Sequence, residues 1–180
     1  AFHWNGKTYE RVWEKELPDG KGVISLAISG DGRTLLITDY RLINKLKETS
    51  ATYVLQWNGE TRPEDSRRAY KPIWDKKDFD FNLSRPALSA DGRVLVFSDE
   101  DKGLIYAYRW NTETKTYAEA LNVSFGTPIL RPPLRPFTFN SLDISADGKT
   151  LLVGKNNGAN ILHWDGTTYD HVWYLEDDLS

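Results

Sequence analysis

The segment "SLAISGDGRTLLIT" (residues 25–38) returns twice, as "PALSADGRVLVFSD" (86–99) and as "SLDISADGKTLLVG" (141–154). In each copy an apolar run precedes an Asp-Gly dipeptide and a second apolar run follows it. Asp-Gly tolerates the positive φ angles that tight hairpin turns require. Each copy therefore predicts a β-hairpin, with its turn at Asp31-Gly32, Asp91-Gly92 or Asp147-Gly148.

A second phrase alternates with the first. It reads "FHWNGKTY" (2–9), "LQWNGETR" (55–62), "YRWNTETKTY" (108–117) and "LHWDGTTY" (162–169). Asn58-Gly59 and Asp165-Gly166 predict further hairpin turns. The tryptophans, spaced 53, 53 and 54 residues apart, are Trp4, Trp57, Trp110 and Trp164. Because Trp recurs at one structural position, we expect these residues to form a buried, repeated packing core rather than a sugar-stacking site.

Two such hairpins make a four-stranded antiparallel unit of about 55 residues, which is what propeller blades look like in sequence. The sequence thus predicts an all-β protein with β-propeller-type blades, about three and a half in this chain. The expected divisions of this single propeller segment are a half blade at 1–20 and blades at 21–74, 75–122 and 123–180. One short segment, "YRLINKLKETS" (40–50), has spacing that fits a helical turn or two.

The "S-x-DG-x-x-L" strand pairs followed by "W-[ND]-G-x-T-Y" resemble integrin-type (FG-GAP) and WD-like propeller repeats over nearly the whole chain. The chain lacks the Gly-His dipeptide that usually precedes WD blades, and it lacks the Asp-x-Asp-x-Asp-Gly calcium loop of integrin-type blades. The resemblance therefore implies a propeller fold and leaves the function open.

Composition narrows the class of protein. The 180 residues carry a net charge of −3, with 39% hydrophobic and 27% charged residues, which predicts a globular chain. Because the chain is not basic, we do not expect nucleic acid as its partner. No apolar run approaches the length of about 20 residues that a membrane helix needs. The absence of cysteine excludes disulfides and thiolate metal sites but assigns no compartment. There is no methionine either, so we expect a processed N-terminus or one that begins inside a longer polypeptide.

The blade count predicts a partner. Closed propellers have 4 to 8 blades, and an open arc would leave apolar blade faces exposed to water. We therefore expect additional blades from another chain, another copy of this chain, or a protein partner to cover these faces. The alternative is a distorted four-bladed closure.

The leading functional hypothesis is a non-enzymatic binding or scaffolding segment. Long, unequal segments (40–52, 60–85 and 112–140) are expected to gather at the end of the blades opposite the tight turns, where repeat proteins often bind. These segments hold side chains that favour protein interfaces. The candidate binding residues are Arg67, Arg68, Tyr70, Trp74, Arg131 and Arg135.

Other sites have weaker signals. Asp78, Asp80 and Asn82 have calcium-loop spacing, but Leu83 stands where such a loop needs glycine, so a strand is the preferred interpretation and no metal or cofactor is expected. A propeller hydrolase or lactonase with a channel metal, and a carbohydrate-binding propeller, remain alternative functions. Asn82 and Asn122 match the glycosylation acceptor pattern, which has meaning only in a secreted protein.

The residue before each repeated tryptophan is His3, Gln56, Arg109 or His163. A position that accepts histidine, glutamine and arginine within one chain is expected to be a polar strand position rather than a catalytic or metal-binding one. The sequence predicts no nucleophile, because no G-x-S-x-G and no thiol is present.

Overall fold

The computed structural model describes residues 1–4, 6–11, 14, 21–43, 47–59, 70–79, 83–99, 103–125, 139–155 and 158–176. These residues form strands and turns, and no helix occurs among them. Consequently the described part of the chain contains no helix that is long and apolar enough to cross a membrane.

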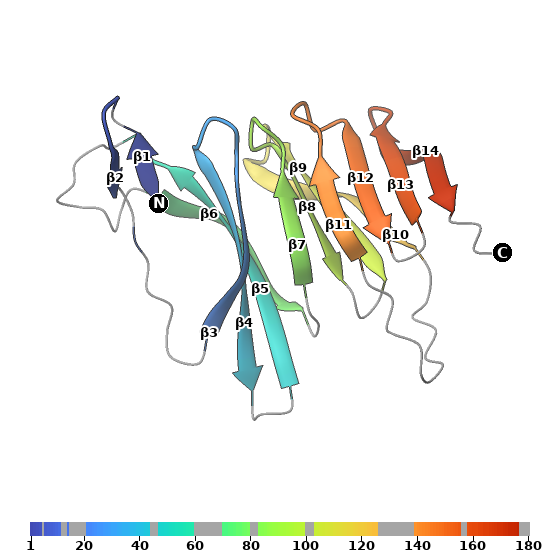
Figure 1. Cartoon of the computed structure of the whole chain (residues 1–180), viewed down its shortest axis with the longest axis horizontal. Helices are drawn as coiled ribbons and strands as arrows, with labels where there is room; N and C mark the ends of the chain where they lie inside the picture. The colour runs from blue at the N-terminus through green and yellow to red at the C-terminus, as the bar shows by residue number, and fades with distance from the viewer. Residues whose placement is uncertain are drawn as a thin grey trace.

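Three four-stranded antiparallel sheets stand one after another along the molecule (Figure 1), preceded by a two-stranded hairpin. The hairpin consists of β1 (Phe2–Trp4) and β2 (Tyr9–Arg11). Blade 1 consists of β3 (Lys21–Ile28), β4 (Thr34–Ile43), β5 (Lys47–Trp57) and β6 (Tyr70–Phe79). Blade 2 consists of β7 (Leu83–Leu88), β8 (Val94–Asp99), β9 (Leu104–Asn111) and β10 (Thr116–Ser124). Blade 3 consists of β11 (Phe139–Ile144), β12 (Thr150–Lys155), β13 (Gly158–Trp164) and β14 (Tyr169–Glu176).

The first strands of the blades lie next to one another. β3 contacts β7, and β7 contacts β11, so the three blades meet along their first strands. Backbone hydrogen bonds join their turns: the Gly30 amide donates to the Ala90 carbonyl at 2.9 Å, and the Ala90 amide donates to the Ala146 carbonyl at 3.1 Å. Within each blade the strands pair in chain order, which is the up-and-down arrangement expected of propeller blades.

The predicted all-β architecture of four-stranded blades is confirmed. Positive φ angles occur at the glycine of each predicted turn, for example 70° at Gly32 and 69° at Gly92. The predicted helical turn at residues 40–50 is wrong, because β4 and β5 cover its described residues and pair with each other. The blade ends also differ from the expected divisions at 74 and 122, since β6 continues to Phe79 and β10 to Ser124.

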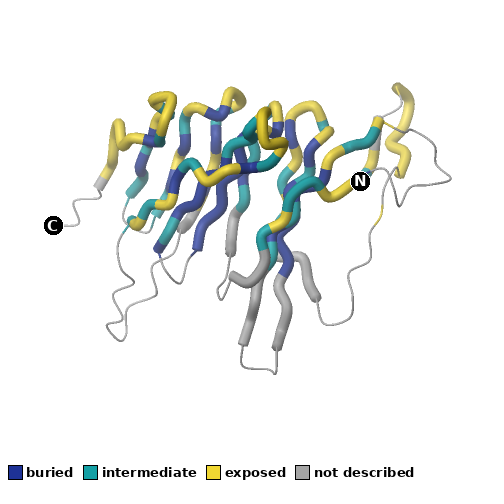
Figure 2. The backbone as a smooth tube through the Cα atoms, turned by 180° about the vertical axis from the view of Figure 1, so that it is seen from behind, coloured by how far each residue is buried: buried dark blue, intermediate teal, exposed yellow. Residues whose placement is uncertain are grey.

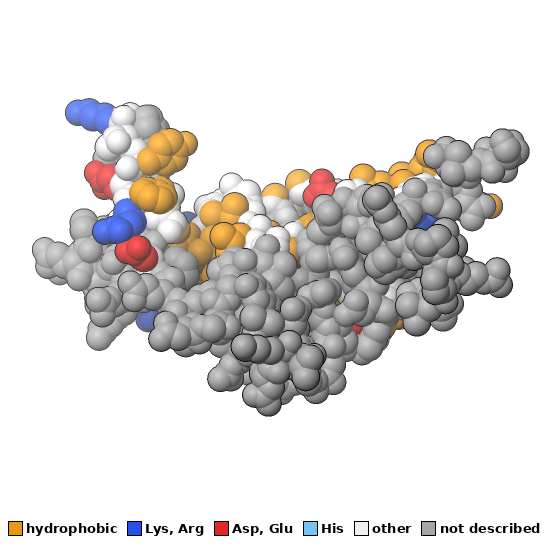
Figure 3. Space-filling model, turned by 60° about the horizontal axis from the view of Figure 1, so that its bottom comes forward, with side chains coloured by type: hydrophobic (Ala, Val, Ile, Leu, Met, Phe, Trp, Pro, Cys, Tyr) orange, Lys and Arg blue, Asp and Glu red, His pale blue; other side chains and the backbone are white. Residues whose placement is uncertain are grey.

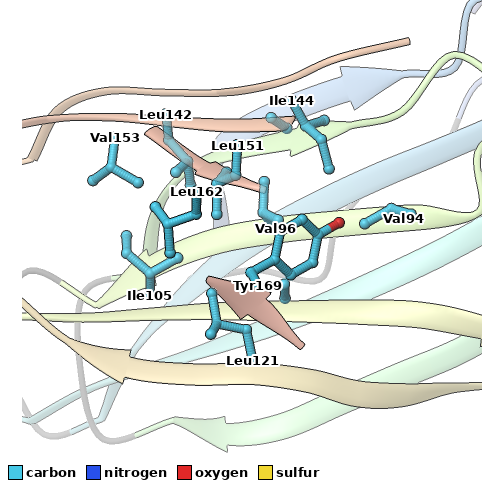
Figure 4. Packing of buried hydrophobic residues seen from close by; sticks show 12 residues of the cluster. Val94, Val96, Ile105, Leu121, Leu142, Ile144, Leu151, Val153, Leu162 and Tyr169 are labelled. Carbon is cyan, nitrogen blue, oxygen red and sulfur yellow. The ribbon is translucent and has the colours of Figure 1, made fainter. Parts of the chain in front are cut away.

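Apolar side chains of adjacent blades form the core. Figure 4 shows the cluster between blades 2 and 3, to which Val94 and Val96 of β8 and Leu151 and Val153 of β12 belong. A second cluster between blades 1 and 2 contains Leu36 of β4 and the fully buried Phe97 of β8. Because strand side chains alternate between faces, blade 2, which lies in the middle, contributes to both clusters.

The N-terminal hairpin has the same register as the last two strands of each blade. Trp4 pairs with Tyr9, just as Trp57 pairs with Tyr70 and Trp110 pairs with Tyr117. The hairpin projects at one end of the molecule and carries exposed hydrophobic side chains (Figure 3). It therefore corresponds to the outer half of a blade.

Candidate functional site

The Asp-Gly turns are held by one repeated set of hydrogen bonds. In blade 2 the Ser89 hydroxyl donates to the Asp91 carboxylate at 2.7 Å and accepts the Val94 amide at 2.9 Å. The Arg93 amide donates to the same carboxylate oxygen at 2.9 Å. Blades 1 and 3 repeat this pattern around Ser29 and Ser145.

This geometry sets the direction in which the pKa of two of these aspartates, Asp31 and Asp147, departs from its ordinary value. The hydrogen bond from Ser29 holds the pKa of Asp31 below its ordinary value, and the hydrogen bond from Ser145 does the same for Asp147. A depressed pKa means that the carboxylate adds stability above its unfolded pKa and that this stability is lost as the pH falls through the folded pKa.

We therefore expect the free energy of unfolding to fall as the pH decreases below about 4. Urea titrations between about pH 5 and pH 2 would measure this decline. The double variant Asp31→Asn and Asp147→Asn should show a shallower decline, because it removes two of the carboxylates whose pKa is lowered in the folded state. An unchanged pH dependence in that variant would contradict the assignment.

A tryptophan–tyrosine pair lies beside each Asp-Gly turn. The ring centroids lie 5.2 Å apart for Trp57 and Tyr70, and 5.1 Å apart for Trp110 and Tyr117. Blade 3 repeats the pair at 5.1 Å with Trp164 and Tyr169. Each tyrosine hydroxyl donates to the carbonyl of the turn glycine in its own blade, which ties the two hairpins of the blade together.

An arginine occupies the junction between blades 2 and 3. Arg109 of β9 donates from Nη1 to the Gly148 carbonyl at 2.8 Å and to the Tyr169 hydroxyl at 3.0 Å. Its guanidinium carbon lies 4.4 Å from the centre of the Trp164 ring. The strand of one blade thus places a cation against the turn glycine and the aromatic pair of the next blade.

The junction between blades 1 and 2 has the same parts with a different residue in the arginine position. Gln56 stands one residue before Trp57, just as Arg109 stands one residue before Trp110. A cavity of about 230 Å³ opens here, and its lining is mixed polar and aromatic. Its lining residues are Asp31, Arg33, Thr34, Gln56, Ile73, Asp91, Gly92, Arg93, Trp110 and Tyr117.

Residues of β6 pack beside this cavity against blade 2. The Trp74 ring lies 5.1 Å from Tyr108 and 5.8 Å from Tyr117, measured between centroids. Lys76 forms a hydrogen bond with the Tyr108 hydroxyl and lies 3.8 Å from the Glu119 carboxylate. Trp74, a predicted binding residue, therefore serves the contact between blades.

Tyr70 and the repeated tryptophans, which were also predicted as site or core residues, differ in how far they are buried. Tyr70 is only 7% exposed, and its hydroxyl donates to the Gly32 carbonyl, so it offers little surface to a partner. Trp57, Trp110 and Trp164 are partly rather than largely buried, because each lies near the turn end of its blade. Trp4 lies in β1, and its side chain is outside the described residues.

Several predictions fall outside the described residues. These include the side chain of Asp78 and the whole of Asp80, Asn82, Arg67, Arg68, Arg131 and Arg135. Among the described strands, β6 begins at the Asp-Gly end of its blade, whereas β11 begins at the other end (Figure 1).

Two buried carboxylates were missed by sequence reasoning. Asp39 is 2% exposed and Asp99 is 0% exposed, and each lies ten residues after the turn serine of its blade. The shared offset from the repeated serine is the signal that could have found them. Among the described residues, no group of three or more His, Cys, Asp or Glu side chains could hold a metal ion.

Comparisons with known proteins agree with the blade architecture. No family model matches the chain, and no curated protein matches it. Among solved structures, the Dos1 propeller is similar with a TM-score of 0.59 and 12% identity over 88% of this chain and 34% of that one. A protein from Lactobacillus plantarum is similar with a TM-score of 0.57 and 15% identity over 91% of this chain and 45% of that one.

A third similar structure is described as a putative 6-phosphogluconolactonase from Bacteroides fragilis. Its TM-score is 0.54 at 16% identity, over 87% of this chain and 42% of that one. The chain thus spans less than half the length of these three structures. At this level of identity the similarity establishes the fold alone, and the fold of this chain is that of β-propeller blades.

Proposed function

We propose that this chain is a non-catalytic binding segment of a β-propeller, and that its two end faces bind further propeller blades. The observation that carries the proposal is a difference in exposure between equivalent positions. Side chains that are buried where two blades meet are exposed at the two ends of the array. Equivalent positions in the first two strands of a blade are counted from its turn serine. Equivalent positions in the last two strands follow from the strand pairing: Trp74 pairs with the residue three before Trp57, and Trp173 pairs with the residue three before Trp164.

The first end face belongs to β3 of blade 1. Leu26 is 65% exposed and Ile28 is 56% exposed, whereas the equivalent Leu142 and Ile144 of β11 are 9% and 8% exposed. Leu142 and Ile144 are covered by blade 2, which precedes them. A preceding blade would cover Leu26 and Ile28 in the same way.

The second end face belongs to blade 3. Leu152 of β12 is 40% exposed, whereas the equivalent Leu36 and Val96 are both 0% exposed. Trp173 of β14 is 48% exposed, yet its equivalent Trp74 packs on two tyrosines of the following blade. The run of exposed residues on β14 is visible at the C-terminal end of the molecule in Figure 2.

Covering these faces is favourable by ordinary hydrophobic burial. A leucine or isoleucine side chain gains about 1.5–3 kcal/mol when it is fully buried. Several such side chains on each face would support an interface that resembles a core cut in half rather than a transient contact. The proposal also includes a protein partner that contacts one or more of four arginines, namely Arg67, Arg68, Arg131 and Arg135.

Light scattering of the full chain tests the proposal. We expect concentration-dependent association at micromolar concentration, together with binding of a hydrophobic dye. Replacing Leu26 and Ile28 with aspartate, or Trp173 and Leu175 with aspartate, should reduce both signals at least severalfold. Tyr174→Asp is the matched control, because strand alternation places Tyr174 on the opposite side of β14.

A wild-type chain that stays monomeric and binds no dye would contradict the proposal. So would face variants that associate as strongly as the Tyr174→Asp control.

A further inference from the structure

The cavity between blades 1 and 2 is equivalent to a site that holds a cation between blades 2 and 3. Gly92, Trp110 and Tyr117 around the cavity correspond by register to Gly148, Trp164 and Tyr169 around Arg109. We propose that this cavity binds a guanidinium group, such as the side chain of an arginine from a partner protein. The inference goes beyond the binding of further blades, because both walls of the cavity belong to this chain.

The occupied junction gives the chemistry of recognition. There the guanidinium of Arg109 donates to the Gly148 carbonyl and to the Tyr169 hydroxyl and stacks on the Trp164 ring. A planar guanidinium suits this arrangement, because it donates along two directions in its plane while its face lies on an indole. An ammonium group cannot make the same stacked and forked contact.

The acceptors at the cavity are arranged in the same way. The Tyr117 hydroxyl donates its hydrogen to the Gly92 carbonyl, as Tyr169 does to Gly148. The oxygen of Tyr117 therefore keeps lone pairs that can accept from a guanidinium, as Tyr169 accepts from Arg109. The Trp110 and Tyr117 rings keep the 5.1 Å spacing of the Trp164 and Tyr169 rings.

The short side chain of Gln56 explains why a cavity is present between blades 1 and 2. Its side chain is shorter than that of arginine by two bonds and carries no charge, so it cannot supply the guanidinium that Arg109 supplies. Gln56 lines the cavity and is exposed to solvent, and the lining also includes Asp31 and Asp91. A cation can therefore enter from solvent and approach two negative charges.

Arg33 and Arg93 in the lining do not prevent the cavity from binding a guanidinium. Arg93 lies 4.0 Å from Asp91 and is partly compensated by it. At the occupied junction the equivalent positions carry the same formal charges, and that junction nevertheless holds a guanidinium. The residues at these positions are Asp91, Arg93, Asp147 and Lys149. The local charge balance of the cavity is thus compatible with a cationic ligand.

A reciprocal exchange of two side chains tests the proposal in the full chain. The probes are methylguanidine and N-acetyl-arginine-N-methylamide, with the neutral N-acetyl-citrulline-N-methylamide as control. The readout is the indole N–H signal of each tryptophan in proton–nitrogen correlation spectra. We expect both guanidinium probes to shift the Trp110 signal in a saturable way and the citrulline probe to leave it unchanged.

The variants define the site. Gln56→Arg should weaken binding at Trp110 at least tenfold, because its own guanidinium fills the cavity. Arg109→Gln should create a second site, seen as a new saturable shift of the Trp164 signal. If N-acetyl-arginine-N-methylamide binds more tightly than methylguanidine, the natural ligand is an arginine side chain of a peptide or protein. If the two bind equally, the natural ligand is a small guanidinium compound. Either result supports a guanidinium site.

Equal shifts by the citrulline probe, or undiminished binding in Gln56→Arg, would overturn the proposal. If Arg109→Gln does not fold, the Gln56→Arg comparison decides the matter alone. Failure here leaves the end-face proposal untouched, since that proposal concerns Leu26, Ile28 and the surface of blade 3.

Discussion

Replacing Gly148 with alanine should lower the free energy of unfolding by roughly 2–5 kcal/mol, whereas Gly32→Ala should lower it by about 1–2 kcal/mol. Both glycines have positive φ angles, 67° and 70°, so both variants carry the backbone cost of a left-handed residue. An added Cβ at Gly148 would also lie 2.5 Å from Cγ2 of Val94 in the preceding blade. At Gly32 it would meet nothing within 4 Å.

Urea denaturation of the two variants measures the difference, and Gly92→Ala provides a second test. An added Cβ at Gly92 would lie 2.4 Å from the Thr34 hydroxyl oxygen of blade 1, so its cost should resemble that of Gly148→Ala. Equal losses at Gly32 and Gly148 would show that the close approach between blades is not maintained in solution.

Replacing Phe97 with alanine should lower the free energy of unfolding by about 3–5 kcal/mol. Phe97 is fully buried between blades 1 and 2, and its ring stacks on Tyr108 with centroids 5.5 Å apart. The variant loses the transfer energy of the ring and leaves a cavity that neighbouring strands cannot close, because their backbones are fixed by the sheet.

Phe2→Ala is the matched control for this substitution. Phe2 is 67% exposed, so its removal should change stability by no more than about 0.5 kcal/mol. A small loss in Phe97→Ala would mean that blades 1 and 2 do not share a packed core, and it would weaken the equivalence between the two blade junctions.

The sequence was sufficient for features built from local contacts. The Ser-x-Asp-Gly turns use hydrogen bonds between residues two and five positions apart, so a pattern of neighbouring letters predicts them. Alternation and Asp-Gly dipeptides likewise predict strands and hairpins, and the four-stranded blades are confirmed. The helical turn expected at 40–50 failed because its spacing also fits long strands, and pairing between β4 and β5 decided between them.

The burial of the tryptophans was only partly predictable. Repetition correctly indicated that Trp57, Trp110 and Trp164 occupy one structural position. How far each is buried depends on the blade that follows, on the tyrosine partner and on the distance from the turn end. Those contacts join residues that are 13, 7 and 5 positions apart within blades and much farther apart between blades.

The sequence by itself determined the hairpins, their turns and the repeated position before each tryptophan, because these depend on short-range geometry and on the two-residue period of a strand. Only the tertiary structure decided that Arg109, which holds this position in blade 2, points at the turn glycine of blade 3, Gly148, 39 residues away in the sequence. It also decided which apolar positions are covered, since Leu26 and Leu142 have the same place in the repeat and differ only in having a neighbouring blade. Burial and cation binding are properties of two packed sheets, and no single hairpin encodes the position of the second sheet.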